Sequence, residues 1–164
     1  MAPHGTFVAD GLRMINSCFK GYSTTPSKVR VDAWRVKLFC QAIGETDAVH
    51  WDEVAARLAG HPGCPVPPTF LKALEAEHCS SAALLQVLQV SVGQVLHAEQ
   101  SFDYTGPVHV GDEVEIQRSI SDLYDKRGGA ISFIVVQTVY RVARIEVGSS
   151  VQTIMIRNQT AVAV

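Results

Sequence analysis

The hydrophobic pattern of this chain changes its period near Gly93, and this change constrains the fold more than any other feature. Before Gly93, apolar residues recur about every 3.6 positions, which is typical of amphipathic helices. After Gly93, apolar and polar residues alternate with a period of two, as in strands with one buried face. Consecutive strands joined by short turns form an antiparallel sheet. The sequence therefore predicts an α+β architecture, with helices gathered on one face of the sheet.

Three helical segments are predicted in the first half. The first follows Asp32, a good N-cap residue, and stops at Gly44. The second starts at Asp52. The third starts at Thr69 after a proline-rich approach, and the segment 78–81 is a candidate for an interruption of it. The apolar stripe expected on the second helix consists of Val54, Ala55, Leu58 and Ala59.

Four strands are predicted in the second half, after a short one near residues 28–31. In the segment 96–104, strict alternation places Leu96 on the same face as Phe102. The segment 130–142 is apolar on both faces, as expected of a central strand in a covered sheet. Turn residues at 125–129 indicate a hairpin before it, and the last strand runs roughly over 149–157.

Composition bounds the class of protein. The 164 residues fit one domain, 1–164, and a hydrophobic content of 47% is enough for a full core. The net charge of −2 gives no reason to expect nucleic acid or a membrane surface as a partner. The apolar runs are too short to span a membrane, and a secretion signal is not evident, so we expect a cytoplasmic protein. The four cysteines lack zinc-site spacing and fit free thiols.

One short loop concentrates groups that could carry chemistry. Between the first two predicted helices, Glu45, Asp47 and His50 lie within seven residues. A carboxylate and an imidazole held together can move protons to and from a substrate. A solvated polar loop would have the same composition, because loops are polar in general.

The stretch 31–158, about three-quarters of the chain, resembles the MaoC-like hot-dog dehydratase/hydratase family. Active members carry a loop of the type G-D-x-N-P-x-H-x-D. The corresponding segment here is GETDAVHWD, residues 44–52, in which Gly44, His50 and Asp52 match. Glu45 stands where the family has its catalytic aspartate, and Asp47 replaces the asparagine.

Three further segments resemble one branch of that family, the N-terminal-type dehydratase domains. They are VPPTF at 66–70, VLHAEQSFDY at 95–104 and LYDKRGG at 123–129. Many domains of this branch lack the catalytic histidine and bind the acyl chain for an active partner subunit. The retained His50 distinguishes this chain from such domains.

The resemblance implies a single hot-dog fold, in which a long central helix is wrapped by an antiparallel β-sheet. It also implies reversible hydration of an enoyl thioester to a (3R)-hydroxyacyl thioester, without a metal or redox cofactor. The substrate would be an acyl-CoA or an acyl-carrier thioester. A homodimer, or a heterodimer with another hot-dog subunit, is the expected assembly.

The family pattern also assigns roles to individual residues. Glu45 and His50 would form the acid/base pair, with Asp47 as a rival acid, and the N–H of Thr69 would stabilise the thioester oxygen. Residues expected to contact substrate are Phe70, Leu71, Lys126 and Arg127. Two alternatives remain open: a non-catalytic acyl-binding subunit of a heteromeric dehydratase, and a hot-dog thioesterase, since one fold hosts several chemistries.

Overall fold

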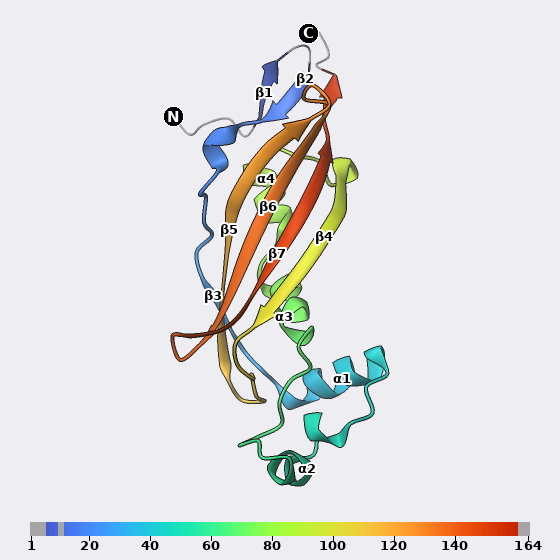
Figure 1. Cartoon of the computed structure of the whole chain (residues 1–164), viewed down its shortest axis with the longest axis vertical. Helices are drawn as coiled ribbons and strands as arrows, with labels where there is room; N and C mark the ends of the chain where they lie inside the picture. Colours follow the sequence, from blue (N-terminus) through green and yellow to red (C-terminus); the bar gives the residue numbers. More distant parts are fainter. Residues whose placement is uncertain (1–5, 10–11, 161–164) are drawn as a thin grey trace.

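A five-stranded antiparallel sheet forms the body of the computed structural model, which describes residues 6–9 and 12–160 (Figure 1). The strand order is β3-β5-β6-β7-β4, so β6 lies in the middle and β3 and β4 form the two edges. The predicted antiparallel α+β architecture is thereby confirmed. The bounds are β3 Ser27–Arg30, β4 Val95–Tyr104, β5 Glu113–Lys126, β6 Ile131–Val142 and β7 Ile145–Arg157.

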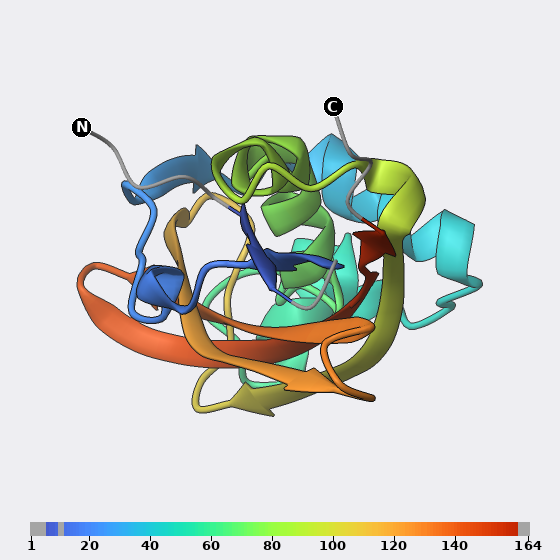
Figure 2. The same cartoon turned by 90° about the horizontal axis from the view of Figure 1, so that it is seen from above.

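The central helix is divided in two. Helix α3 covers Phe70–His78 and α4 covers Ser81–Val87, and both lie against the concave face of the curved sheet (Figure 2). The break falls at Cys79 and Ser80, within the segment expected to interrupt the helix. The Ser80 hydroxyl accepts a hydrogen bond from the Ala83 N–H, so the second helix begins with its own cap.

The other helices project beyond one end of the sheet (Figure 1). They are α1 at Ala33–Ile43, the 3₁₀ turn η2 at Ala48–His50 and α2 at Glu53–Leu58. Further 3₁₀ turns are η1 at Ser17–Phe19 and η3 at Val92–Gln94. No helix among the described residues is long and apolar enough to span a membrane.

A smaller sheet with the order β1-β2-β8 lies near the chain ends. Its strands are Thr6–Ala9, Leu12–Ile15 and Gln159–Thr160. Most of residues 1–25 could not be assigned from the sequence, and of these 1–5 and 10–11 lie outside the described residues.

The core between helix and sheet consists of two apolar clusters. One gathers around α3 and includes Leu74 and Ile116, and the other gathers around α4 and includes Leu88 and Ile120. Buried polar residues lie between them, notably Glu75 on α3 and Arg118, Thr138 and Ser150 on the sheet. On β6 the inner side chains are buried, whereas the apolar outer ones are only partly covered. The expectation that both faces of this strand are buried is therefore wrong within the single chain.

Two predictions about side-chain direction are also wrong. The apolar stripe expected on α2 faces outward, since Val54 and Leu58 are 67% and 86% exposed, and Ala56 is buried instead. In β4, the register shifts between His97 and Glu99, so Leu96 and Phe102 lie on opposite faces of the sheet. A β-bulge adds one residue to a strand and inverts the alternation beyond it.

Candidate active site

The loop 44–52 is ordered by its own acidic side chains. Gly44 takes the left-handed conformation (φ 74°), which ends α1 and lets its N–H bond back to the carbonyls of the last turn. Asp47 Oδ1 accepts from the Val49 N–H at 3.0 Å, at the start of η2. Asp52 Oδ1 caps α2 by accepting from the N–H groups of Val54 and Ala55. These contacts fix the loop at both ends, as its position between two helices predicts.

Glu45 is folded back onto this loop. Its Oε1 accepts hydrogen bonds from the N–H groups of Thr46 (2.8 Å) and Asp47 (2.9 Å). The amides of Asp47 and Thr46, and to a lesser extent the nearby charge of His50, lower the pKa of the Glu45 carboxyl below its usual value. Oε2 accepts no hydrogen bond from the described residues. Glu45 is therefore ionised at neutral pH, with one oxygen committed to the loop and one available.

His50 is held by a main-chain carbonyl from a different segment. Its Nδ1 lies 2.7 Å from the Pro65 oxygen. A carbonyl oxygen only accepts, so Nδ1 carries the proton and the neutral ring presents Nε2 as an acceptor. The imidazole is thus held in the tautomer that a general base requires. This contact could not be predicted from the sequence, because every residue has a main-chain carbonyl.

The N-terminus of α3 leaves one amide free. The N–H groups of Phe70 and Leu71 bond to the carbonyls of Pro67 and Pro68. The Thr69 N–H, by contrast, has no acceptor within the described part of the chain. Thr69 is exposed, so this donor can reach a ligand. The Thr69 amide, which is predicted from the sequence to bind an oxyanion, therefore has no hydrogen-bond acceptor among the described residues.

The Pro65 carbonyl brings His50 near this helix start. Thr69 is four positions after Pro65, so the two lie at most about 14 Å apart along the chain. Glu45, His50 and Thr69 therefore belong to the same end of the molecule, although Glu45 makes no hydrogen bond to the His50 ring. Glu45, His50 and Thr69 are thus neighbours, but no hydrogen bond joins them to one another.

Two cavities flank this region. One, of about 230 Å³, is lined by His50, the rings of Trp34 and Trp51, Lys37 and Cys64, among others. Trp34 and Lys37 did not emerge from the sequence as site residues, since they read as positions on an ordinary helix. Neither Glu45 nor Asp47 is part of this cavity wall.

The second cavity, of about 390 Å³, lies at the start of α3. Pro68 and Leu71 line it together with residues 104–108, which begin at the last residue of β4. Its walls are mainly apolar, which suits an acyl chain. Phe70 instead points toward α1, where its ring meets Phe39 edge to face at 5.4 Å between centroids. Of the two predicted acyl contacts, Leu71 faces the cavity beside Thr69 and Phe70 does not.

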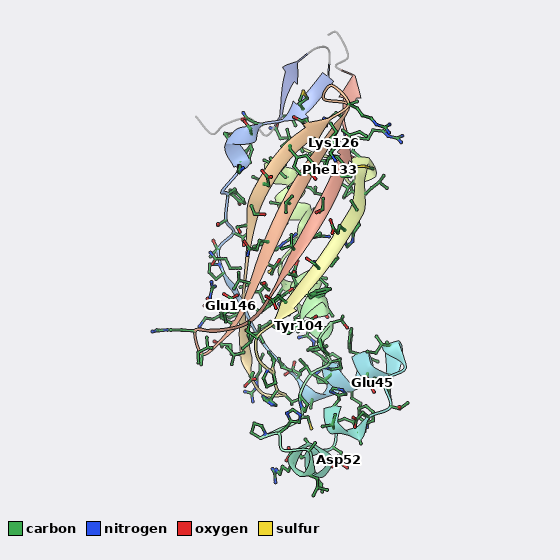
Figure 3. The ribbon with its side chains drawn as sticks, in the orientation of Figure 1. Glu45, Asp52, Tyr104, Lys126, Phe133 and Glu146 are labelled. Atoms are coloured by element: carbon green, nitrogen blue, oxygen red, sulfur yellow. The ribbon has the colours of Figure 1, made fainter. Side chains whose placement is uncertain are left out.

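Lys126 lies at the opposite end of the sheet from Glu45 (Figure 3), and Arg127 follows it directly after the end of β5. The Lys126 ammonium stands 5.6 Å from the Tyr124 ring centroid and 5.2 Å from that of Phe133. Such cation–π contacts account for its position without a ligand. Within one chain, these two cations are not brought to the loop 44–52.

An antiparallel sheet that curves around a central helix defines a hot-dog domain. Residues 18–147 match the family model described as the FAS1-like dehydratase domain region, and the chain belongs to that family. No group of three or more metal-binding side chains is gathered among the described residues.

Curated relatives carry no functional name. A UPF0336 protein of Clavibacter michiganensis is 34% identical over 97 residues, which is 59% of this chain and 65% of that protein. A UPF0336 protein of Streptomyces griseus is 29% identical over 115 residues, 65% of this chain and 76% of that protein. The match thus spans slightly less than two-thirds of the Clavibacter protein.

Solved structures share the fold. The HadBC (3R)-hydroxyacyl-ACP dehydratase complex of Mycobacterium tuberculosis matches with a TM-score of 0.72 and 20% identity, over 84% of this chain and 96% of the other. The (R)-hydratase of A. caviae matches with a TM-score of 0.63 and 19% identity, over 82% and 94%. A MaoC-like dehydratase matches with a TM-score of 0.74 and 22% identity, over 86% and 43%. The hot-dog prediction and the MaoC-like resemblance are confirmed.

Proposed function

We propose that this protein catalyses reversible hydration of an enoyl thioester, with His50 as the principal proton-transfer group. The observation that carries the proposal is the 2.7 Å contact between His50 Nδ1 and the Pro65 carbonyl. This contact leaves Nε2 as the acceptor and anchors the imidazole to the segment that leads into α3. The family and the (R)-hydratases among its structural neighbours support this reaction class.

In the hydration direction, a water molecule loses a proton as it attacks the β-carbon of the substrate. His50 Nε2 accepts that proton and then donates it to the α-carbon, so the hydroxyl adds to the β-carbon and the ring returns to its neutral form. The thioester oxygen gains negative charge, which the free Thr69 N–H stabilises. The substrate is an acyl-CoA or acyl-carrier thioester whose chain occupies the cavity lined by Leu71. The scheme calls for no metal and no redox cofactor.

Glu45 is the carboxylate of this scheme. Its free Oε2 orients the attacking water, while Oε1 holds the loop in place. Asp47 is the rival acid, but its Oδ1 is also used as a cap. Because a displacement of about one ångström can lower a rate about 100-fold, the longer glutamate side chain is expected to give modest turnover.

Hydration of crotonyl-CoA by the purified protein tests the proposal. We expect His50→Ala to lower kcat by about 10²- to 10⁴-fold, the usual contribution of a positioned general base. His97→Ala is the matched control, because this exposed histidine on β4 hydrogen-bonds only to the Glu99 carbonyl. The proposal is contradicted if His50→Ala and His97→Ala retain equal activity.

A second candidate function is that of a non-catalytic acyl-binding subunit in a heteromeric dehydratase. The engagement of Glu45 by its own loop favours it. So do two separate features: the free edge of β4, and an exposed apolar row on α1 that includes Trp34 (66% exposed) and Leu38 (57%). Exposed apolar rows and open sheet edges suit a partner subunit, here a second hot-dog chain.

Two solved neighbours are themselves complexes, HadBC and ChsH1–ChsH2 of Mycobacterium tuberculosis. Whether this chain pairs with a copy of itself or with another hot-dog subunit is tested by light scattering of the purified protein. A homodimer that is disrupted by Leu38→Glu supports self-association. A stable monomer without turnover of crotonyl-CoA supports the subunit function.

A further inference from the structure

A cavity of about 310 Å³ lies at the break between α3 and α4. Its walls come from the segment 22–27, the helix break, α4 and Arg118 on β5. About ten residues, or roughly 15 Å of helix, separate it from Thr69. It is therefore distinct from the candidate active site.

The side chains that line the cavity include polar and basic groups but no acidic group. The lining residues contribute five hydroxyl groups, a thiol, an imidazole and a guanidinium, and no carboxylate. The hydroxyls of Thr25 and Ser27 make no hydrogen bond to the described residues, so they remain available as donors. Such a set of donors suits a negatively charged ligand.

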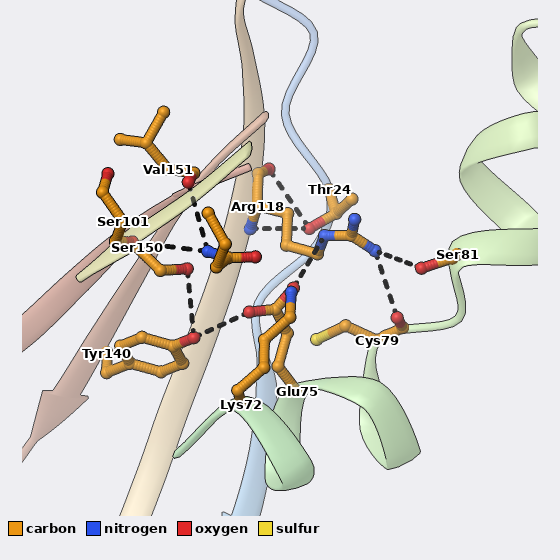
Figure 4. Close-up of polar contacts among 11 residues, drawn as sticks. Thr24, Lys72, Glu75, Cys79, Ser81, Ser101, Arg118, Tyr140, Ser150 and Val151 are labelled. Carbon is orange, nitrogen blue, oxygen red and sulfur yellow. Dashed lines mark hydrogen bonds and ion pairs between the residues drawn. The ribbon is translucent and has the colours of Figure 1, made fainter. Parts of the chain in front are cut away.

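Arg118 is the buried cation of this wall, with only 2% of its surface exposed. Its Nη1 donates to the Cys79 carbonyl (3.2 Å) and the Ser81 hydroxyl (3.4 Å), which holds the helix break together (Figure 4). Its Nε lies 3.5 Å from Glu75 Oε1. Among the described residues, neither Nε nor Nη2 has a hydrogen-bond acceptor. A buried arginine with unsatisfied donors is unusual, because such donors cost free energy.

The charges around Arg118 do not balance. Glu75 Oε1 also accepts from Lys72 Nζ at 2.7 Å, and Oε2 accepts from the Tyr140 hydroxyl at 2.7 Å. One buried carboxylate thus serves two cations, and the group carries a net positive charge. At low dielectric an uncompensated charge is costly, and an anion placed nearby relieves that cost.

We propose that this cavity binds a small anion, through a carboxylate or a phosphate group recognised by Arg118 and the free hydroxyls of Thr25 and Ser27. The volume corresponds to roughly ten water molecules, so the ligand is a small metabolite-sized ion and not a polymer. Because Nη2 is covered by neighbouring atoms, the guanidinium turns toward the cavity when the anion binds. This site goes beyond the proposed hydratase activity and does not depend on it.

The thiol of Cys79 provides a local readout. It lies in the cavity wall and is partly buried, whereas Cys18 is exposed and does not line the cavity. Alkylation of both thiols by iodoacetamide is followed by peptide mass spectrometry. Inorganic phosphate and succinate are added in separate arms, with chloride at the same ionic strength as the control. We expect one of the two anions to slow alkylation of Cys79 severalfold without changing that of Cys18.

Variants identify the groups that bind. Arg118→Lys keeps the charge but loses the guanidinium fork, and we expect the anion concentration that gives half of the maximal protection to rise roughly ten- to hundredfold. Thr25→Val with Ser27→Ala removes only the free hydroxyls and leaves the arginine network intact, so it serves if Arg118→Lys does not fold. Ser23→Ala, in the same segment but outside the wall, is the matched control. In this variant the anion should protect Cys79 as it does in the natural protein. The proposal would be overturned if Cys79 of the natural protein were alkylated equally fast in phosphate, succinate and chloride. It would also be overturned if Arg118→Lys and the Thr25→Val, Ser27→Ala variant were both protected as fully as the natural protein.

Discussion

Glu45 combines two tasks that a single substitution can separate. As a loop residue it needs only an acceptor oxygen for the N–H groups of Thr46 and Asp47. As a catalytic residue it needs a negative charge. Glu45→Gln keeps the acceptor and removes the charge. If Glu45 acts on the water, kcat for crotonyl-CoA should fall by about 10²- to 10⁴-fold at a temperature where both proteins are folded. Unchanged turnover would restrict Glu45 to its structural task.

The lowered pKa of Glu45 also makes stability depend on pH. The folded pKa lies below the usual value of 4.5, chiefly because the loop amides favour the ionised form. This contribution is present above the usual pKa and is lost as pH falls through the lowered value. We expect the natural protein to exceed Glu45→Gln in melting temperature near neutral pH, and the gap to close as pH falls through the lowered pKa of Glu45. A gap that is constant over this range would contradict the prediction.

Helix α2 is short enough to depend on its cap. It covers Glu53–Leu58, and Asp52 Oδ1 satisfies two of its first N–H groups. Asp52→Ala should lower the free energy of unfolding by about 0.5–2 kcal/mol, as at other caps. Asp52→Asn retains an acceptor oxygen and should lose much less. Urea unfolding measures both variants, and equal stabilities of Asp52→Ala and the natural protein would be the contrary result.

The boundaries of these helices could be predicted from the sequence better than their orientation. Asp52 and Gly44 mark real ends, because caps act through local hydrogen bonds. The direction in which Val54 and Leu58 point depends on where a six-residue helix docks, and no local pattern fixes that. The bulge in β4 is a similar case, since one extra residue in the pairing moves Leu96 to the outer face.

The assembled fold brings together functional groups that are distant in the sequence. His50 and its carbonyl partner are fifteen positions apart, and only the docking of the proline-rich segment brings them together. The buried Arg118 did leave a signal, since it occupies the inward register of β5 between Ile116 and Ile120. A charge in that register predicts a buried partner, which the structure identifies as Glu75 from α3. The identity of that partner follows from helix packing and could not be read from β5 alone.

Tyr140 links the two halves of this buried polar group, between the clusters around α3 and α4. Its hydroxyl donates to Glu75, a buried carboxylate, so Tyr140→Phe should lower the free energy of unfolding by about 1.5–3 kcal/mol near neutral pH. Tyr124→Phe, at an exposed ring on β5, is the control. Burial, then the charge of Glu75, raises the pKa of Tyr140 above its usual value of 10.0. The stability that Tyr140 contributes is therefore present below about pH 10 and is lost as pH rises further, because the unfolded chain then loses a proton that the folded one keeps. In urea titrations at increasing pH, the gap between the natural protein and Tyr140→Phe should narrow above pH 10, and a gap that widens there would contradict this account of the buried network.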